Sequence, residues 1–431
     1  MSGGDMTAPA GEVPSEVVVQ KYGGSSLATT EQVHAVARRI ASVARSGRRV
    51  VAVVSAQGRT TDHLIRQAEA LTPAAAGREL DQLLATGETA SAALMAMAVH
   101  RTGVCATALS GAQSGILATG PHGSGIIVAI DTERMWRLLE SGRVVVVAGF
   151  QGVTADGDAI TLGRGGSDTT AVAVAAELRA RHCEIYSDVA GVLTADPRIV
   201  PHARLMPDIG IDVMAEMAFA GAKVVHSRAV ELADLYGVDI HVGHSAAAQA
   251  GTRIHKRDGE DMLEAKAAVM AVVDDQDIVR VTLHTTQTRE DPALAVFRIL
   301  AQQTVPADMT TVVERPGGGR TIGLTVSPSH VPLVREALTG SEVPLRMEVD
   351  DEIAKVSIVG KGLLSRPEYA ARLLASLTAS GITARCLSAS QLRVSVTVPS
   401  GETRRAVGVL HSEFGLDAVT DSASLRLARR T

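Results

Sequence analysis

The chain has 431 residues, of which 46% are hydrophobic and 21% are charged, and its formal net charge is −5. Its length exceeds what one hydrophobic core usually organises, so we expect two or three domains, and this composition excludes global disorder. No block of Lys and Arg could follow a nucleic-acid backbone, and no apolar run approaches the roughly 20 residues that span a bilayer, so neither nucleic acid nor a membrane is an expected partner.

Residues 1–15 are predicted to form a disordered leader, because they are rich in Gly, Ser, Pro and Ala and lack the apolar segment of a secretory signal. The three cysteines, Cys105, Cys183 and Cys386, lie far apart and form no CxxC pair. We interpret each as a reduced core thiol, which predicts a cytoplasmic protein.

From residue 16 to residue 244, short β-branched runs alternate with segments of helical period, which predicts βαβ units and a mainly parallel sheet. The predicted strands are apolar segments of the kind that is buried on both faces. They lie at residues 17–19, 50–54, 126–128, 144–147, 184–186 and 239–242. Apolar residues at helical spacing predict helices over 33–43 and 80–94.

The second half of the chain is predicted to be an internal repeat of two small α+β modules. In the first module, strands at 279–283 and 321–326 enclose a helix at 293–302; in the second, strands at 354–359 and 392–398 enclose a helix at 369–380. Further helices at 334–338 and 403–414 complete the modules. We therefore place a catalytic domain at 16–250, a linker at 251–265, and modules at 266–345 and 346–431.

Two glycine-containing turns could bind anions. The first strand leads into Lys21, Tyr22, the pair Gly23-Gly24 and Ser25, where backbone N–H groups and the lysine could hold phosphates, although the glycines are equally explained by a turn that needs positive φ. The second turn, at 161–170, joins an apolar strand to an alanine-rich helix. It contains Arg164, a glycine pair, Ser167 and Asp168, the last two on the first helical turn.

A third cation, Lys223, follows a Gly-Ala pair, and three cations with two anion-binding turns suggest phosphoryl transfer. Each cation taken alone could be a solvated surface group. The absence of GxxxxGK[ST] excludes a P-loop, and the absence of GxGxxG after the first strand argues against a dinucleotide-dependent oxidoreductase. No close cluster of metal-ligating residues is present, so no protein-held metal site is predicted.

In order and spacing, six segments resemble the aspartokinases of the amino-acid kinase family, and the two terminal modules resemble the paired ACT domains of these enzymes. The segments are 20–26, 55–62, 86–88, 149–170, 187–198 and 221–226. The resemblance implies an α/β fold, with a mainly parallel sheet covered by helices on both faces, followed by two ferredoxin-like ACT modules. It also implies ATP- and Mg²⁺-dependent phosphorylation of the side-chain carboxylate of L-aspartate, the first step toward lysine, threonine and methionine.

The resemblance assigns roles to individual residues. Lys21 and Lys223 match the lysines that neutralise the transferring phosphoryl group, and Asp168 matches the carboxylate that orients them. Arg164 matches the group that binds the α-carboxylate and Glu88 the acceptor of the α-ammonium, with Thr61 and Ser167 in the same pocket. The implied nucleotide site comprises Lys21, Tyr22, Gly23, Gly24, Ser25, Ser187, Asp188, Thr194, Arg198, Lys223 and Val224. An ionised aspartate side chain needs no general base.

The chain departs from the family pattern mostly in its second half. The effector-binding loops of regulated relatives align with 288–291, Glu368 and 388–391, where expected Pro, Gly and Glu residues are replaced. We predict that inhibition by lysine and threonine is weak or absent and that the ACT modules serve to assemble a homodimer. Milder departures are Gln57, Thr89 and Ser227. Two alternatives stay open: a kinase of another small amino-acid carboxylate, and a non-catalytic ACT-bearing regulatory subunit.

Overall fold

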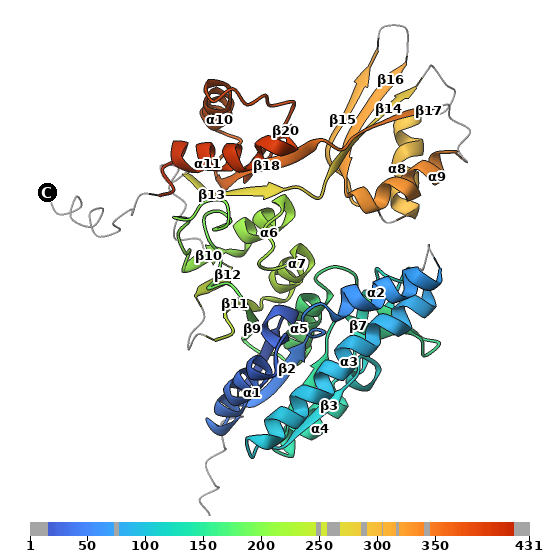
Figure 1. The fold of residues 1–431 in the computed structure, drawn as a ribbon, viewed down its shortest axis with the longest axis vertical. Helices are drawn as coiled ribbons and strands as arrows, with labels where there is room; N and C mark the ends of the chain where they lie inside the picture. Colours follow the sequence, from blue (N-terminus) through green and yellow to red (C-terminus); the bar gives the residue numbers. More distant parts are fainter. Residues whose placement is uncertain are drawn as a thin grey trace, which may run out of the picture. The chain divides into compact units, whose positions relative to one another are not determined.

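The computed structural model describes residues 16–72, 77–246, 251–256, 268–285, 291–303, 305–315, 319–339 and 345–417, so the predicted leader lies outside the described residues. The chain forms two compact units (Figure 1). Among the described residues, the first unit comprises 16–192, 205–215 and 224–256, and the second comprises 193–204, 216–223 and the residues from 268 onward. No helix in these ranges is long and apolar enough to cross a membrane.

The first unit is built on an eight-stranded sheet in the order β10-β12-β11-β9-β1-β2-β6-β3. All neighbouring strands are parallel except β11 and β12. The strands are β1 Val17–Tyr22, β2 Arg49–Val54, β3 Ala106–Leu109, β6 Val144–Ala148, β9 His182–Ser187, β10 Asp208–Gly210, β11 Asp239–His244 and β12 Thr252–His255. Strands β2 and β6 are buried along almost their whole length, as their continuous valine runs predict.

Helices cover both faces of this sheet, which confirms the predicted fold class. Helices α1 Thr30–Arg45 and α3 Arg78–Arg101 pack on one face with Tyr22, while α5 Gly166–Glu177 packs on the other. The remaining helices of this part are α2 Thr60–Leu71, α4 Glu133–Glu140, α6 Ile211–Ala220 and α7 Ser227–Tyr236. Because neighbouring side chains of a strand point to opposite faces, Lys21 is directed toward α5.

A small second sheet in the first unit corrects one prediction. It has the order β5-β4-β7-β8, with β4 Ile116–Thr119, β5 Ile126–Ile130, β7 Gln151–Val153 and β8 Ala159–Thr161. Strand β5 is an edge strand antiparallel to β4, and Ile126 and Val128 are 55% and 54% exposed, so this apolar run is not buried on both faces. The core-thiol prediction is also wrong for Cys105, which is exposed, whereas Cys183 is buried and Cys386 is intermediate.

The second unit contains two four-stranded antiparallel sheets, as the predicted pair of α+β modules requires. The first module has the strand order β15-β16-β14-β17 and the second β13-β18-β20-β19. The elements are β13 Ala268–Asp275, β14 Val279–Thr285, α8 Pro292–Gln302, β15 Asp308–Glu314, β16 Arg320–Val326, α9 Val331–Thr339, β17 Leu345–Asp350, β18 Ile353–Lys361, α10 Glu368–Ala379, β19 Cys386–Ala389, β20 Arg393–Pro399 and α11 Thr403–Glu413.

Strand pairing differs from the predicted boundaries. β12 lies in the stretch predicted as a linker at 251–265 and pairs with β10 and β11; residues 257–265 lie outside the described ones. β13 pairs with β18, so it belongs to the second module, and β17 pairs with β14 across the predicted boundary at 345. The repeat pattern locates the elements, but partner choice depends on tertiary contacts that the pattern does not contain.

Candidate functional site

An ion pair joins the two predicted anion-binding turns of the first unit. Lys21 stands near the end of β1, and Asp168 on the first turn of α5; the Lys21 Nζ and Asp168 Oδ1 atoms are 2.6 Å apart. Their side chains are only 12% and 11% exposed. Asp168 Oδ2 also accepts a hydrogen bond from the His226 backbone N–H at 3.3 Å. The carboxylate therefore fixes the lysine head against the start of α5.

A pocket of about 240 Å³ surrounds this ion pair. Its lining brings together six residues of the first unit to which the resemblance assigned a role in catalysis or in aspartate binding. They are Lys21, Thr61, Glu88, Arg164, Ser167 and Asp168, and Ser55, Phe150, Gly163, Gly165 and Gly166 complete the wall. The pocket is thus rich in both cationic and anionic groups, as a binding site for a zwitterion requires.

Glu88, on α3, is the buried anion of the pocket and is 3% exposed. Its Oε1 accepts a hydrogen bond from the Ala56 N–H at 3.1 Å, whereas Oε2 is buried without a hydrogen-bond partner among the described residues. Burial raises the pKa of Glu88 to about 7, in spite of the lowering effect of the backbone donors. A buried carboxylate oxygen without a donor is suited to receive a ligand ammonium.

The turn around Arg164 depends on its glycines. Gly163 and Gly165 have φ values of 71° and 67°, which residues with a Cβ rarely adopt. A Cβ on Gly165 would also collide with the His226 ring. Because Gly165 is the N-cap of α5, the first turn of that helix, with its positive dipole end, forms the pocket wall beside Arg164.

The glycine pair after β1 has a different explanation from the predicted one. Neither Gly23 nor Gly24 has a positive φ, so the expectation of a turn that needs one is wrong. Instead, a Cβ on Gly24 would lie 2.6 Å from the carbonyl oxygen of Ala56, and Gly24 O accepts a hydrogen bond from Gly58 N–H at 2.9 Å. The glycine permits two backbones to approach closely.

Except for Val224, the first-unit residues of the implied nucleotide site lie at the ends of β1 and β9 or directly after them. Ser25 Oγ donates to Asp188 Oδ1 at 3.4 Å, which brings two of them together. The ring of Tyr22 is fully buried and stacked on Tyr186 at 5.3 Å between ring centroids, so only the backbone of Tyr22 is left for a nucleotide. Ser187, at the end of β9, is half-buried.

The other implied nucleotide residues fall in different parts of the chain. Val224 belongs to the first unit, whereas Arg198 and Lys223 belong to the second. Arg198 forms an ion pair with Asp196, with 2.6 Å between Nη2 and Oδ2, and the Lys223 side chain is exposed. The Thr194 hydroxyl is buried, accepts from Arg204 N–H and contacts His411, so the expectation that this hydroxyl belongs to the nucleotide site is wrong.

Sequence reasoning gave no role to His226 or Phe150. His226 lay in a segment that carried the resemblance, three residues after Lys223, and that position was the available signal. Phe150 lines the pocket with a φ of 67°, a conformation that is strained for a bulky residue and gathers at functional sites. No sequence pattern reports such a backbone angle.

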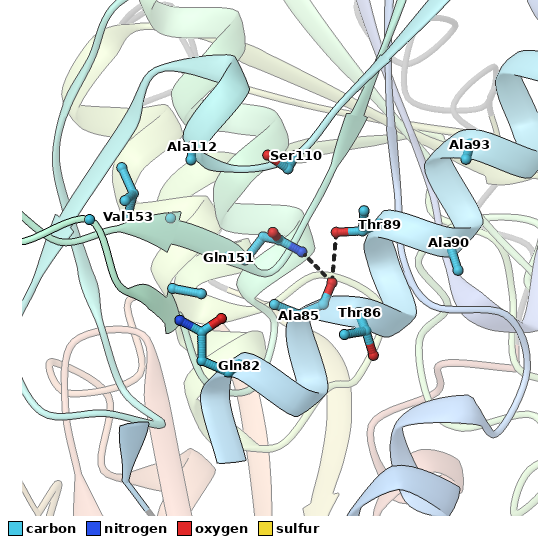
Figure 2. Close-up of a pocket in the computed structure, with 13 residues that line it drawn as sticks. Gln82, Ala85, Thr86, Thr89, Ala90, Ala93, Ser110, Ala112, Gln151 and Val153 are labelled. Carbon is cyan, nitrogen blue, oxygen red and sulfur yellow. Dashed lines mark hydrogen bonds between the residues drawn. The ribbon is translucent and has the colours of Figure 1, made fainter. Parts of the chain in front are cut away.

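A larger hollow of about 550 Å³ lies on a different side of α3 (Figure 2). Small and uncharged residues form its wall, including Thr89, whose hydroxyl donates to Ala85 O at 2.8 Å, and Gln151, whose amide donates to the same oxygen. No charged side chain belongs to this lining. It lacks the groups that would hold a polyanion, so size alone does not identify the site.

Comparisons with known proteins settle the family. Residues 16–288 match the amino acid kinase family, and residues 356–414 match an ACT domain. The aspartokinase of Mycolicibacterium smegmatis is 43% identical over 406 residues, which cover 93% of this chain and 96% of that protein. The chain belongs to the aspartokinases. The aspartokinase of Geobacillus stearothermophilus is 39% identical over 403 residues, which cover 93% of this chain and 97% of that protein.

Solved aspartokinase structures have the same fold. Escherichia coli aspartokinase III, in complex with aspartate and ADP, matches with a TM-score of 0.78 at 23% identity and covers 92% of this chain and 99% of that one, which bears on the fold alone. Aspartate kinase from Synechocystis matches with a TM-score of 0.52 at 36% identity and covers 93% of this chain and 69% of that one. The resemblance inferred from the motifs is confirmed.

Proposed function

We propose that this chain transfers the γ-phosphoryl group of ATP to the side-chain carboxylate of L-aspartate and so produces 4-phospho-L-aspartate and ADP. The observation that carries the proposal is the buried Glu88 carboxylate, with one oxygen lacking a donor, in the same pocket as Arg164 and the Lys21–Asp168 ion pair. Membership of the aspartokinases supports the choice of substrate.

Substrate recognition follows from the charges of the pocket. Arg164 offers a planar pair of donors to the α-carboxylate, while Glu88 Oε2 accepts from the α-ammonium. Thr61, at the start of α2, and Ser167 supply hydroxyls to the same pocket. An amino acid bound between a fixed cation and a fixed anion presents its side-chain carboxylate in one orientation.

Phosphoryl transfer needs positioning and charge neutralisation rather than a base, because the aspartate side chain is ionised at neutral pH. Lys21, held by Asp168, and the N-terminal turn of α5 provide positive charge where two anions must meet. At the turn expected to bind phosphate, Gly24 packs closely against the Ala56 carbonyl and has no side chain, so only backbone groups face the ligand there. Mg²⁺ bound with ATP would supply further neutralisation.

The proposed nucleotide site comprises the residues that the resemblance to the aspartokinases implies. Gly23, Gly24 and Ser25 would hold phosphates, Ser187 and Asp188 would lie toward the ribose, and Val224 would flank the nucleotide. Lys223 and Arg198 would neutralise phosphate charge. We place no protein-held metal ion in this proposal, and within the described residues no group of three or more His, Cys, Asp or Glu could hold one.

We also propose that lysine and threonine inhibit weakly and that the modules assemble a homodimer in the cytoplasm. Of the altered loop at 288–291, only Asp291 is described; it caps α8 and forms an ion pair with Arg320, with 2.6 Å between Oδ1 and Nη1. The start of α8 is thus occupied by the chain's own groups. Titration of lysine and threonine, singly and together, into the assay tests this; strong inhibition at millimolar levels would contradict it.

The decisive experiment is aspartate-dependent formation of an acyl phosphate from ATP and Mg²⁺, trapped by hydroxylamine. Glutamate and N-acetylglutamate in parallel test the alternative of another small carboxylate, which the departures Gln57 and Thr89 keep open. If the chain consumes no ATP with any of these acceptors and no product is trapped, it is instead a non-catalytic regulatory subunit. The intact Lys21–Asp168 pair argues against that outcome.

A further inference from the structure

Two short segments from within the catalytic part of the sequence belong to the second unit. They are Leu193–Arg204 and Glu216–Lys223, and they carry Arg198 and Lys223, two residues proposed above to bind ATP. The contacts that hold these two segments in place should therefore affect nucleotide binding. This inference rests on the proposed function. The contacts that hold them come largely from the second module.

The segment Leu193–Arg204 packs into the hydrophobic core of the second module. Ala195 and Val200 are 6% and 5% exposed and share one cluster with side chains of α10, β20 and α11. Backbone groups fix it further, because Val272 N–H of β13 donates to Thr194 O at 2.8 Å. Arg404 of α11 donates to Arg198 O at 2.9 Å. The backbone of the proposed phosphate-binding arginine is thus held directly by the second module.

His411, on α11, fixes the same segment through a side chain. It is fully buried, with Nε2 2.9 Å from the Thr194 hydroxyl and Nδ1 2.8 Å from Asp417 Oδ1. The Thr194 hydroxyl already accepts from Arg204 N–H, so its own hydrogen is available to His411. Burial lowers the pKa of His411, which favours the neutral ring that this arrangement uses.

The segment Glu216–Lys223 is held by a cluster of charged side chains, which we call the Asp308 cluster: Glu216, Asp275, Asp308, Lys355 and Arg393. Lys355 Nζ and Arg393 Nη1 lie 3.0 and 2.9 Å from Asp308 Oδ2, and their side chains are 3% and 10% exposed. Arg393 Nε lies 3.1 Å from Glu216 Oε2, and Lys355 Nζ lies 3.7 Å from Asp275 Oδ2. One carboxylate in this cluster, Glu216, stands on α6 itself.

Phe219 completes this attachment. Its ring lies under both cations, 5.6 Å from Lys355 Nζ and 5.1 Å from Arg393 Cζ, and its carbonyl accepts from Lys355 at 3.4 Å. Two residues later, a Cβ on Gly221 would lie 2.5 Å from Asp274 O of β13. The chain is therefore pressed against the second module until two residues before Lys223.

We propose that nucleotide binding by Lys223 and Arg198 depends on the second module, in which Arg393 and Lys355 position the segment of Lys223 and His411 positions the segment of Arg198. These are positioning residues, since they act on ATP only through the segments that they hold. Glu88, Arg164 and Thr61, which are proposed to bind aspartate, lie in the first unit. Loss of positioning should therefore weaken the binding of nucleotide and leave the binding of aspartate.

The test uses the full chain with two conservative substitutions, Arg393→Lys and His411→Gln. The first keeps the charge but loses the fork that reaches Glu216 and Asp308 together. The second keeps an amide that can contact Thr194 but loses the ring nitrogen that lies 2.8 Å from Asp417 Oδ1. Ser357→Ala is the matched control, because it removes a buried hydrogen bond of 2.7 Å to Ser395 on the same two strands, and among the described residues neither serine side chain forms a hydrogen bond with either segment. KM for ATP and for aspartate is measured by hydroxamate trapping, and Kd for ADP with Mg²⁺ by calorimetry.

We expect KM for ATP and Kd for ADP to rise roughly 5- to 30-fold in both test variants, as loss of one or two kcal/mol implies. KM for aspartate should change less than about twofold, and Ser357→Ala should leave all three constants near wild type. Equal rises for ATP and aspartate, or unchanged nucleotide constants in folded variants, would overturn the proposal. If wild type traps no product, the proposed function fails, while the ADP series still tests the positioning.

Discussion

Replacement of Glu88 by Gln separates the binding of substrate from the stability of the fold. The amide has the shape of the carboxylate and can still accept the Ala56 N–H, which lies 3.1 Å from Oε1. What disappears is the charge at Oε2, which has no donor among the described residues. A charge-assisted hydrogen bond contributes about 1.5–3 kcal/mol, so KM for aspartate should rise roughly 10- to 100-fold. KM for ATP should not change.

The same substitution should stabilise the folded chain at alkaline pH. Burial raises the pKa of Glu88 from 4.5 to about 7, so the folded state holds a proton that the unfolded state releases between these values. Stability of the wild type therefore falls as pH rises from 4.5 to 7, by roughly 3 kcal/mol, and is constant above. The Gln variant lacks this loss. Its thermal midpoint should exceed that of the wild type at pH 8 and equal it below pH 4.5.

Two measurements check the reasoning. Thermal unfolding between pH 4 and pH 9 follows the stability difference, and hydroxamate trapping between pH 6 and pH 9 follows KM for aspartate. In the wild type, KM should rise below pH 7, where Glu88 becomes protonated and can no longer accept from the ammonium; in the Gln variant this rise should be absent. Equal aspartate KM in the two proteins, or a Gln variant that is less stable at pH 8, would refute the role given to Glu88.

Three further substitutions probe the pocket. Lys21→Ala should lower kcat at least about 100-fold with the fold retained by circular dichroism, because the pocket loses the cation that Asp168 holds in place; an active variant would contradict this. Arg164→Lys keeps the charge but loses the planar fork, so KM for aspartate should rise about tenfold with kcat little changed, and a tenfold rise in KM for ATP would speak against this assignment. Gly165→Ala should cost about 1–3 kcal/mol in unfolding free energy through the left-handed φ, with the collision with His226 in addition. Gly142→Ala, which has a φ of 76° and open space around it, should cost less in the same melts, and equal losses would remove the collision from the account.

Much of the fold was predictable because, in the first unit, the hydrophobic pattern of each single segment is enough to identify it as a strand or a helix. The valine runs of β2 and β6 have no polar alternation, so they specify strands that are covered on both faces. The edge strand β5 has the same apolar composition, yet Ile126 and Val128 are exposed. Composition describes what a strand can bury, whereas its place in a sheet depends on which neighbours reach it.

The candidate site was predictable where a residue type is required by charge. Glu88, Arg164 and Lys21 line one pocket. Their motifs pointed to a shared site because a stable fold alone seldom requires two cations and an anion in one cavity. The role of Thr194 was predicted wrongly, since a hydroxyl can form a hydrogen bond with a nucleotide or with a buried histidine, and the sequence does not distinguish the two. The partner, His411, lies 217 residues farther along the chain, and no local pattern connects them.

The pairing of β13 with β18 makes the first module an insertion within the second. Asp275 at the end of β13 lies in register with Lys355 near the start of β18, so the two points at which the first module joins the rest are neighbours in one sheet. During synthesis, β13 emerges from the ribosome well before its partner and stays without a pairing edge until the whole intervening module has been made. A strand in that state is exposed to wrong partners. Early folding of the inserted module would shorten the effective loop between β13 and β18, so the order of translation itself favours correct assembly.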